Sequence, residues 1–151
     1  MSNRFLYGAL ALALSLATAS SLAAGTGDNA EAGEGAWFTV AGDARQPQAE
    51  TLQVDPVALK VEGDFKTMKV RVSRALERHN WSEVPYRSYE ARVLFDCRSR
   101  RAFYLDASYF QEPMWQGKPH HVEDYMRDPK PVLFKGMEPN PTERVIRAAC
   151  R

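Results

Sequence analysis

The chain has 151 residues, of which 44% are hydrophobic and 26% are charged, and its formal net charge at pH 7 is +1. This length predicts one small domain, and a net charge so close to zero gives no indication of nucleic-acid binding. Acidic residues predominate from residue 24 to residue 64, and basic residues predominate after it. Such an asymmetry can mark a basic binding face, although the simpler interpretation is that the two parts neighbour one another.

Residues 1–23 have the pattern of a secretory signal peptide. Arg4 supplies positive charge, residues 6–22 are almost wholly apolar or small, and Ser21-Leu22-Ala23 offers small residues where a signal peptidase cleaves. The alternative is a membrane anchor, since a span needs roughly 18 or more apolar residues. No cysteine follows the apolar run, so we expect no bacterial lipoprotein anchor. We expect an exported protein, periplasmic or secreted, without a membrane span after cleavage.

Residues 24–35 consist mainly of Gly, Ala, Asp and Glu, and this composition predicts a disordered lead. The single predicted domain comprises residues 36–151. Alternation of apolar and polar residues predicts its first strands, at residues 37–40, in the region 50–61 and at residues 65–73. Within 50–61, Asp55-Pro56 turns the chain or starts a new segment between two alternating runs. Gly63 predicts the turn of a hairpin between this region and residues 65–73. Residues 75–85 are ambiguous, because they suit either one helical turn or an irregular loop.

The segment from Ser88 to Arg101 predicts a β-hairpin that carries one of the two cysteines. Its polar end, from Arg98 to Arg101, suits a turn, and residues 102–105 are typical of the returning strand. Since strand side chains alternate with period two, the apolar positions share one face; they are Tyr89, Ala91, Val93, Phe95 and Cys97.

Residues 111–127 are expected to form a loop, because proline and glycine interrupt any periodic pattern. The adjacent His120 and His121 could ligate zinc or copper together with Glu123 or Asp124, or capture haem. We prefer the interpretation of a chance pair on a solvated loop, and we assign no metal site and no cofactor.

A C-terminal helix is predicted to begin with Asn140 as its N-cap, Pro141 at its first position and Glu143 in a capping box. Its apolar stripe at helical spacing consists of Val145, Ile146 and Ala149. Residues 132–134 before it suit a short edge strand. About six strands followed by one helix predict an α+β fold, an antiparallel sheet with the helix packed on one face.

Cys97 and Cys150 are the only cysteines, and an exported protein meets an oxidising compartment in which disulfides persist. Two cysteines allow a single intramolecular pairing, so we expect a bond between the predicted hairpin and the end of the helix. Two free thiols or an intermolecular bond are the alternatives.

The sequence contains no recognisable catalytic constellation, and we predict a binding protein, not an enzyme. Arg98, Arg100 and Arg101 at the hairpin turn form a candidate patch for an acidic polysaccharide or an anionic protein segment. The competing interpretation is a solvated turn. A periplasmic enzyme or enzyme inhibitor with its site in residues 111–127 is the alternative function.

Several short motifs resemble the surface-adhesin protein E-like family over roughly residues 37–151. They are Tyr86-Arg87-Ser88, Phe95-Asp96-Cys97 followed by basic residues, the Gly117-Lys118 loop, and Ala148-Ala149-Cys150 at the end of a capped helix. The order of Asp-Cys, a long gap, a helix and a terminal Cys is the most specific part. The Val54-Asp55-Pro56 segment before the Gly63 hairpin is also similar.

The resemblance implies an antiparallel sheet with a C-terminal helix tied to it by a disulfide, here between Cys97 and Cys150. It also implies an adhesin of a Gram-negative bacterium that binds host matrix and serum proteins and can form a homodimer. The family's adhesin is lipid-anchored, whereas this chain lacks a cysteine at the end of its signal, which makes surface display doubtful.

Overall fold

The computed structural model describes residues 36–151 of the chain. The predicted signal peptide, residues 1–23, and the predicted disordered lead, residues 24–35, lie outside the described residues.

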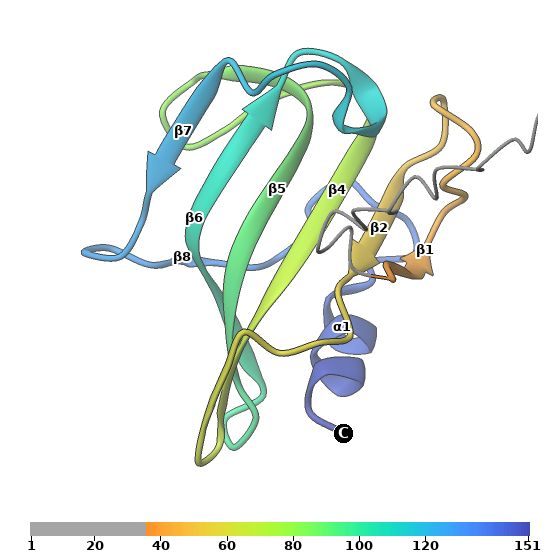
Figure 1. The fold of residues 1–151 in the computed structure, drawn as a ribbon. Coiled ribbons are helices and arrows are strands. Elements are labelled where there is room, and N and C mark those ends of the chain that lie inside the picture. Colours follow the sequence, from red (N-terminus) through yellow and green to blue (C-terminus); the bar gives the residue numbers. More distant parts are fainter. Residues whose placement is uncertain (1–35) are drawn as a thin grey trace, which may run out of the picture. The chain divides into compact units, whose positions relative to one another are not determined.

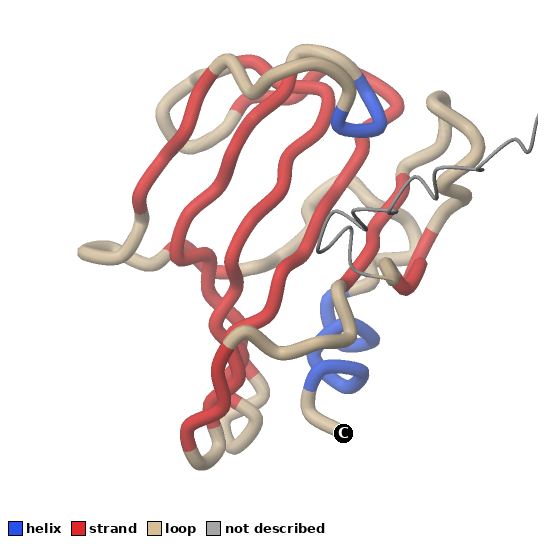
Figure 2. The backbone as a smooth tube through the Cα atoms, in the orientation of Figure 1, coloured by secondary structure: helices blue, strands red, loops and turns tan. Residues whose placement is uncertain are grey.

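Eight strands form one antiparallel sheet (Figures 1 and 2). They are β1 (Phe38–Ala41), β2 (Thr51–Val54), β3 (Lys60–Glu62), β4 (Phe65–His79), β5 (Pro85–Asp96), β6 (Arg101–Phe110), β7 (His121–Asp124) and β8 (Lys130–Pro131). Their order in space is β1-β2-β4-β5-β6-β7, with β3 paired to β4 and β8 paired to β6. A 3₁₀ helix η1 (Pro113–Trp115) and one α-helix, α1 (Thr142–Ala149), complete the fold.

The core lies against one face of the sheet, because the strands alternate apolar and polar side chains. On β4, Met68, Val70 and Val72 are buried in the core, while Arg71 and Ser73 between and beyond them point to the outer face. The segment that follows β8 passes behind β6, β5 and β4 in Figure 1 and leads to α1. This segment and α1 cover the core face.

Helix α1 packs on the sheet through Val145, Ile146 and Ala149, which are buried in the core. The helix begins at Thr142 and its N-cap is Pro141 without a side-chain cap, so the predicted N-cap Asn140 and its capping box with Glu143 are wrong by one residue. Asn140 Oδ1 nevertheless accepts the Thr142 N–H at 3.0 Å. The end of the helix is bound to the sheet by a cation from β4, Lys66.

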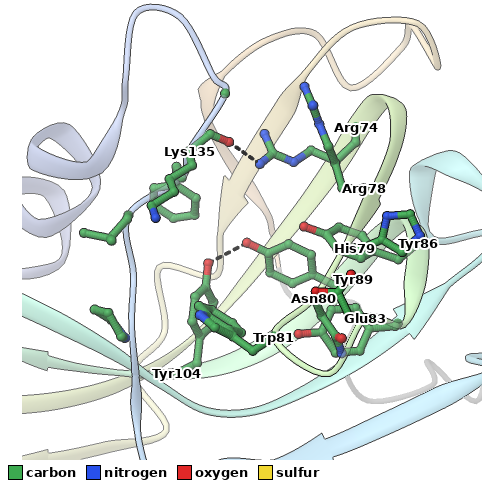
Figure 3. A pocket seen from close by; sticks show the side chains of 15 residues that line it. Arg74, Arg78, His79, Asn80, Trp81, Glu83, Tyr86, Tyr89, Tyr104 and Lys135 are labelled. Carbon is green, nitrogen blue, oxygen red and sulfur yellow. Dashed lines mark hydrogen bonds between the residues drawn. The ribbon is translucent and has the colours of Figure 1, made fainter.

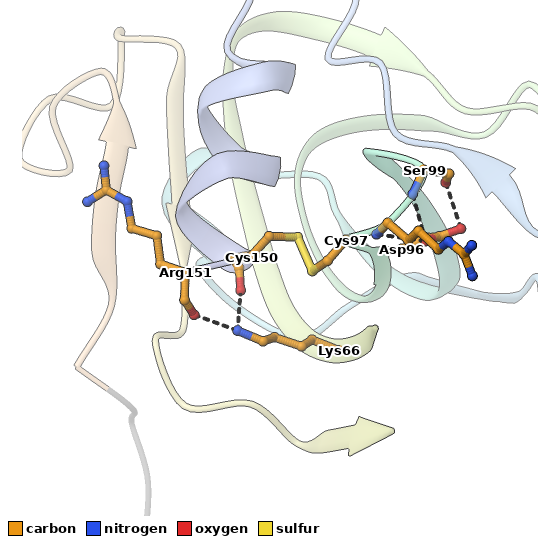
Figure 4. Close-up of a disulfide and its surroundings, with 8 residues drawn as sticks. Lys66, Asp96, Cys97, Ser99, Cys150 and Arg151 are labelled. Atoms are coloured by element: carbon orange, nitrogen blue, oxygen red, sulfur yellow. Dashed lines mark hydrogen bonds between the residues drawn. A yellow bond between two sulfur atoms is a disulfide. The ribbon is translucent and has the colours of Figure 1, made fainter. Parts of the chain in front are cut away.

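Lys66 Nζ donates to the carbonyl oxygens of Ala149 and Arg151, at 2.9 and 2.7 Å (Figure 4). A positive charge at a helix C-terminus is favourable because it meets carbonyl groups that lack a partner in the helix. Beside this contact the Cys97–Cys150 disulfide joins the end of β5 to the end of α1, with Cα atoms 5.4 Å apart. The predicted intramolecular pairing is therefore confirmed.

The structure confirms the predicted α+β fold, with eight strands in place of about six. Besides the start of α1, it differs from the sequence-based expectation in three segments. Residues 75–79 continue β4 through an irregularity between Ser73 and Arg78, after which Arg78 and His79 pair with Tyr86 and Pro85 at the start of β5. Residues 111–127 are more ordered than a loop, since they include η1 and β7. The edge strand expected at 132–134 lies at 130–131, where it pairs with Phe103 and Tyr104 of β6.

Reduction of the disulfide is expected to destabilise the domain strongly. The bond closes a loop between residues separated by 53 positions, which in the chain-entropy model contributes about 4 kcal/mol to the free energy of unfolding. Cys97→Ala and Cys150→Ala should each lower the urea midpoint of the wild type to that of the reduced protein. An unchanged midpoint with and without reductant would contradict this prediction.

Candidate functional site

The predicted arginine patch lies on the turn between β5 and β6, and its three side chains, Arg98, Arg100 and Arg101, are exposed. We call these three residues the arginine tip. Asp96 organises the turn by accepting the N–H groups of Arg98 and Ser99, at 3.1 and 3.0 Å. The Ser99 hydroxyl also donates to Asp96 at 2.6 Å, and this bond lowers the pKa of the carboxyl group. The carboxylate of Asp96 is thus hydrogen-bonded to residues of the turn itself.

Arg100 has a backbone φ of 59°, in the left-handed region that favours glycine. Within residues 36–151, none of the three tip arginines forms an ion pair. Acidic groups are nevertheless close, since Arg98 shares a shallow hollow with Glu62 and Asp64 of the neighbouring β3–β4 turn. The arginine tip therefore consists of three exposed guanidinium groups that lie beside the acidic β3–β4 turn.

Residues 111–116 form a fixed cover on the outer face of the sheet. The Ser88 hydroxyl of β5 donates to the Glu112 carbonyl at 2.6 Å and accepts the Trp115 N–H at 3.0 Å. The Ser73 hydroxyl of β4 accepts the Met114 N–H at 2.9 Å. Because buried hydroxyls bind the backbone at three points, this part of the 111–127 segment is anchored to the sheet.

The outer face also contains a cation–π stack. The Arg71 guanidinium lies 4.2 Å from the ring centroid of Trp37 and 4.0 Å from that of Trp115. Its Nε donates to Gln53 Oε1 at 2.7 Å. Such contacts stabilise a structure when the cation is partly desolvated, and only 17% of the Arg71 side chain is exposed. Trp115 is thus a packing residue of the sheet.

The two histidines of the metal hypothesis lie at the start of β7. His120 is exposed, and His121 Nε2 lies 3.2 Å from Glu123 Oε1. Nowhere in residues 36–151 do three or more His, Cys, Asp or Glu side chains gather in an arrangement that could hold a metal ion.

A cavity of about 510 Å³ lies on the core face, between the sheet and the segment that follows β8 (Figure 3). The end of β4, the β4–β5 turn and the start of β5 form one side, and β6 supplies the floor. Residues 131–136 form the opposite wall, and we call them the covering segment. The sequence-based prediction did not include this site.

Tyrosines form the floor of the cavity. The hydroxyl groups of Tyr89 and Tyr104 are 2.5 Å apart, and those of Tyr109 and Tyr125 are 2.9 Å apart. Burial raises the pKa values of Tyr89, Tyr104 and Tyr109, so these phenols stay protonated at neutral pH. Trp81 from the β4–β5 turn packs edge-on against Tyr104, with ring centroids 5.7 Å apart.

Two arginines from the end of β4 form the upper rim of the cavity in Figure 3. Arg74 donates from one terminal nitrogen to Glu50 Oε2 at 2.8 Å and from the other to the Lys135 carbonyl at 2.6 Å. Arg78 lies 3.9 Å from Glu50 Oε1. The single carboxylate of Glu50 is thus the ion-pair partner of both guanidinium groups.

A signal for this site was present in the sequence. Met68, Val70 and Val72 define the core face of β4, and Arg74 is the next residue with the same alternation. An arginine that continues an apolar face indicates a buried cation, and buried charges require partners. The partner Glu50 and the irregularity before Arg78 belong to tertiary structure, and neither could be found from spacing.

The model of the surface-adhesin protein E family matches residues 37–151, which include the sheet, α1 and the disulfide. The chain belongs to this family. The family is named for a surface adhesin, and membership places the chain among adhesin-like surface proteins. No curated protein and no solved structure matches the chain. Within the part of this family member that the structure describes, no helix is both long and apolar enough to cross a membrane.

The tyrosines predict a loss of stability at alkaline pH. An unfolded tyrosine ionises near pH 10, whereas the folded pKa values of Tyr89, Tyr104 and Tyr109 are higher. The free energy of unfolding should therefore be independent of these groups below about pH 10 and fall above it, because the unfolded state releases protons first. Urea midpoints across this range measure the effect.

The double variant Tyr89→Phe/Tyr104→Phe is the control, because it removes two of the three groups and should flatten the alkaline decline. Folded protein in which all tyrosines ionise together near pH 10, by absorbance of the phenolate, would contradict the prediction.

Proposed function

We propose that this protein is an exported, non-enzymatic binding protein of the bacterial envelope, and that the arginine tip contacts an acidic polysaccharide or an anionic protein partner. The observation that carries the proposal is the unpaired state of the three tip arginines within residues 36–151, on a turn where Arg100 adopts a glycine-like φ of 59°. Strained residues that persist in a fold are a pointer to function. Family membership supports the adhesin-like class.

The chemistry of the tip suits anionic groups. A guanidinium presents its N–H donors in a planar fork that fits a carboxylate or a sulfate with two parallel hydrogen bonds. The backbone of the tip is held by Asp96, and Cys97 beside it is tied to α1. A rigid turn loses less conformational entropy when it binds, which favours affinity.

Export is the second part of the proposal. A signal peptide at residues 1–23 would deliver residues 36–151 to the periplasm or the medium, and the Cys97–Cys150 disulfide is of the kind that persists in oxidising compartments. The alternative is an enzyme or an enzyme inhibitor with its site in residues 111–127, a segment whose first part is held to the sheet by Ser73 and Ser88.

Reversal of charge at the arginine tip should weaken binding to acidic polysaccharide. The triple variant Arg98→Glu, Arg100→Glu and Arg101→Glu should leave a heparin column at lower salt than the wild type, because three favourable charge contacts become repulsive. Circular dichroism checks that the exposed turn tolerates the changes.

The matched control carries the same change of charge at exposed positions elsewhere, Arg127→Glu, Arg144→Glu and Arg147→Glu. It should elute closer to the wild type than the tip variant does. If the two triple variants elute at the same salt concentration, net charge alone governs retention and the tip is not the binding surface.

Protease treatment of intact cells tests the location. If the protein is periplasmic, it should resist the protease, be released by osmotic shock, and have the mass of a chain that begins at Ala24. Digestion of the protein on intact cells would instead place it on the surface. A protein that stays in the cytoplasmic fraction at its full mass would contradict export altogether.

A further inference from the structure

We propose that the cavity beneath the covering segment binds a small organic carboxylate with a planar aromatic body. This proposal concerns a different site from the arginine tip and does not depend on it. The cavity lies at the start of β5, near Tyr86 and Tyr89, whereas the tip follows the end of the same strand, after Asp96.

The size of the cavity suits a small molecule. Its volume of about 510 Å³ lies within the roughly 300–1,000 Å³ that is typical of ligand sites in proteins. Such sites combine mostly apolar walls with a few polar groups that orient the ligand. A simple inorganic anion would leave most of this space unused.

The polar groups of the cavity favour an anion. Arg74 and Arg78 share the single carboxylate of Glu50, so one positive charge of this trio is not balanced. Lys135 adds a further positive charge on the cavity wall, and the exposed Glu83 on the β4–β5 turn offsets one. The arginines and the lysine of the lining, taken together with Glu50 and Glu83, therefore have a net positive charge.

Three residues that line the cavity each have a buried side-chain nitrogen that lacks a hydrogen-bond partner within residues 36–151. These nitrogens are Arg74 Nε, Arg78 Nε and Asn80 Nδ2. Only 6% of the Arg74 side chain is exposed, and Asn80 as a whole is 8% exposed. These three nitrogens themselves have almost no accessible surface, so the donors that a carboxylate in the cavity can reach are the terminal nitrogens of Arg78, whose side chain is 41% exposed.

The walls favour an aromatic body. Tyr86, Tyr89 and Tyr109 pack their rings against one another at centroid distances of 5.1 to 5.8 Å, and Trp81 stands at the edge of Tyr104. The covering segment contributes the apolar side chain of Phe134 to the lining of the same cavity. A planar ring between these surfaces would gain offset or edge-on aromatic contacts.

Two of the five non-glycine residues with a positive φ in residues 36–151 line the same space. Phe134 on the covering segment has a φ of 39° and Glu83 on the β4–β5 turn has a φ of 59°, in the left-handed region that bulky residues rarely adopt. Gly136 has a φ of 77°, and a Cβ at this position would lie 3.3 Å from a terminal nitrogen of Arg78. The covering segment thus runs close to the guanidinium that the ligand would meet.

Nuclear magnetic resonance titration of residues 24–151 with three probes, 2-naphthoate, indole-3-acetate and 3-phenylpropionate, tests the proposal. At least one probe should shift the indole resonance of Trp81 and the amide resonances of the covering segment. The neutral analogue 2-naphthamide should bind at least about tenfold more weakly than 2-naphthoate, because it forms no charge-assisted hydrogen bond with the arginines. Acetate should bind far more weakly, because it lacks the ring.

Arg78→Gln is the informative variant, because 41% of its side chain is exposed and the change keeps most of its length. It should weaken carboxylate binding about tenfold and leave the weak binding of 2-naphthamide unchanged. Arg144→Gln, an exposed change on α1, is the matched control and should bind as the wild type does.

The proposal is overturned if none of the three carboxylates shifts resonances of the cavity. Equal binding of 2-naphthoate and 2-naphthamide would also overturn it, because the arginines would then have no role. The same conclusion follows if Arg78→Gln and Arg144→Gln bind 2-naphthoate with the same affinity.

Discussion

The bond between Cys97 and Cys150 is the constraint on which the rest of the structure depends. It joins the far end of β5 to the last turn of α1, and Lys66 adds two hydrogen bonds to the same helix end. With α1 held on the sheet, the chain between β8 and α1 has to cross the core face. The position of the covering segment, and with it the cavity, follows from this closure.

The same bond also supports the turn between β5 and β6, which lies at the end of β5 remote from the cavity. Cys97 adjoins the turn that presents the arginine tip, so the tip is supported by a covalent link to the core as well as by Asp96. The two candidate sites thus differ in character. The tip is an exposed set of charges on a rigid support, whereas the cavity is a partly enclosed space where Arg74 is desolvated and tied to Glu50.

Binding and stability are in tension at both sites. Arg100, Glu83 and Phe134 occupy backbone conformations that glycine would adopt without strain, and one donor each of Arg74 and Asn80 has no partner among residues 36–151. A domain with a stability of about 5–15 kcal/mol can carry such costs when a disulfide limits the freedom of its unfolded chain.

The sequence by itself determined the antiparallel sheet with a C-terminal helix, the pairing of the two cysteines and the family, because alternation, capping residues and cysteine count are local signals. It also placed the arginines at the hairpin turn. Only the tertiary structure decided that residues 75–79 extend β4 and that residues 111–116 are anchored by Ser73 and Ser88. The tertiary structure alone also decided the cavity, because Glu50, Arg74 and residues 131–136, which meet there, are far apart in the sequence. Contacts between such distant residues depend on the packing of the whole sheet, and no spacing pattern encodes them.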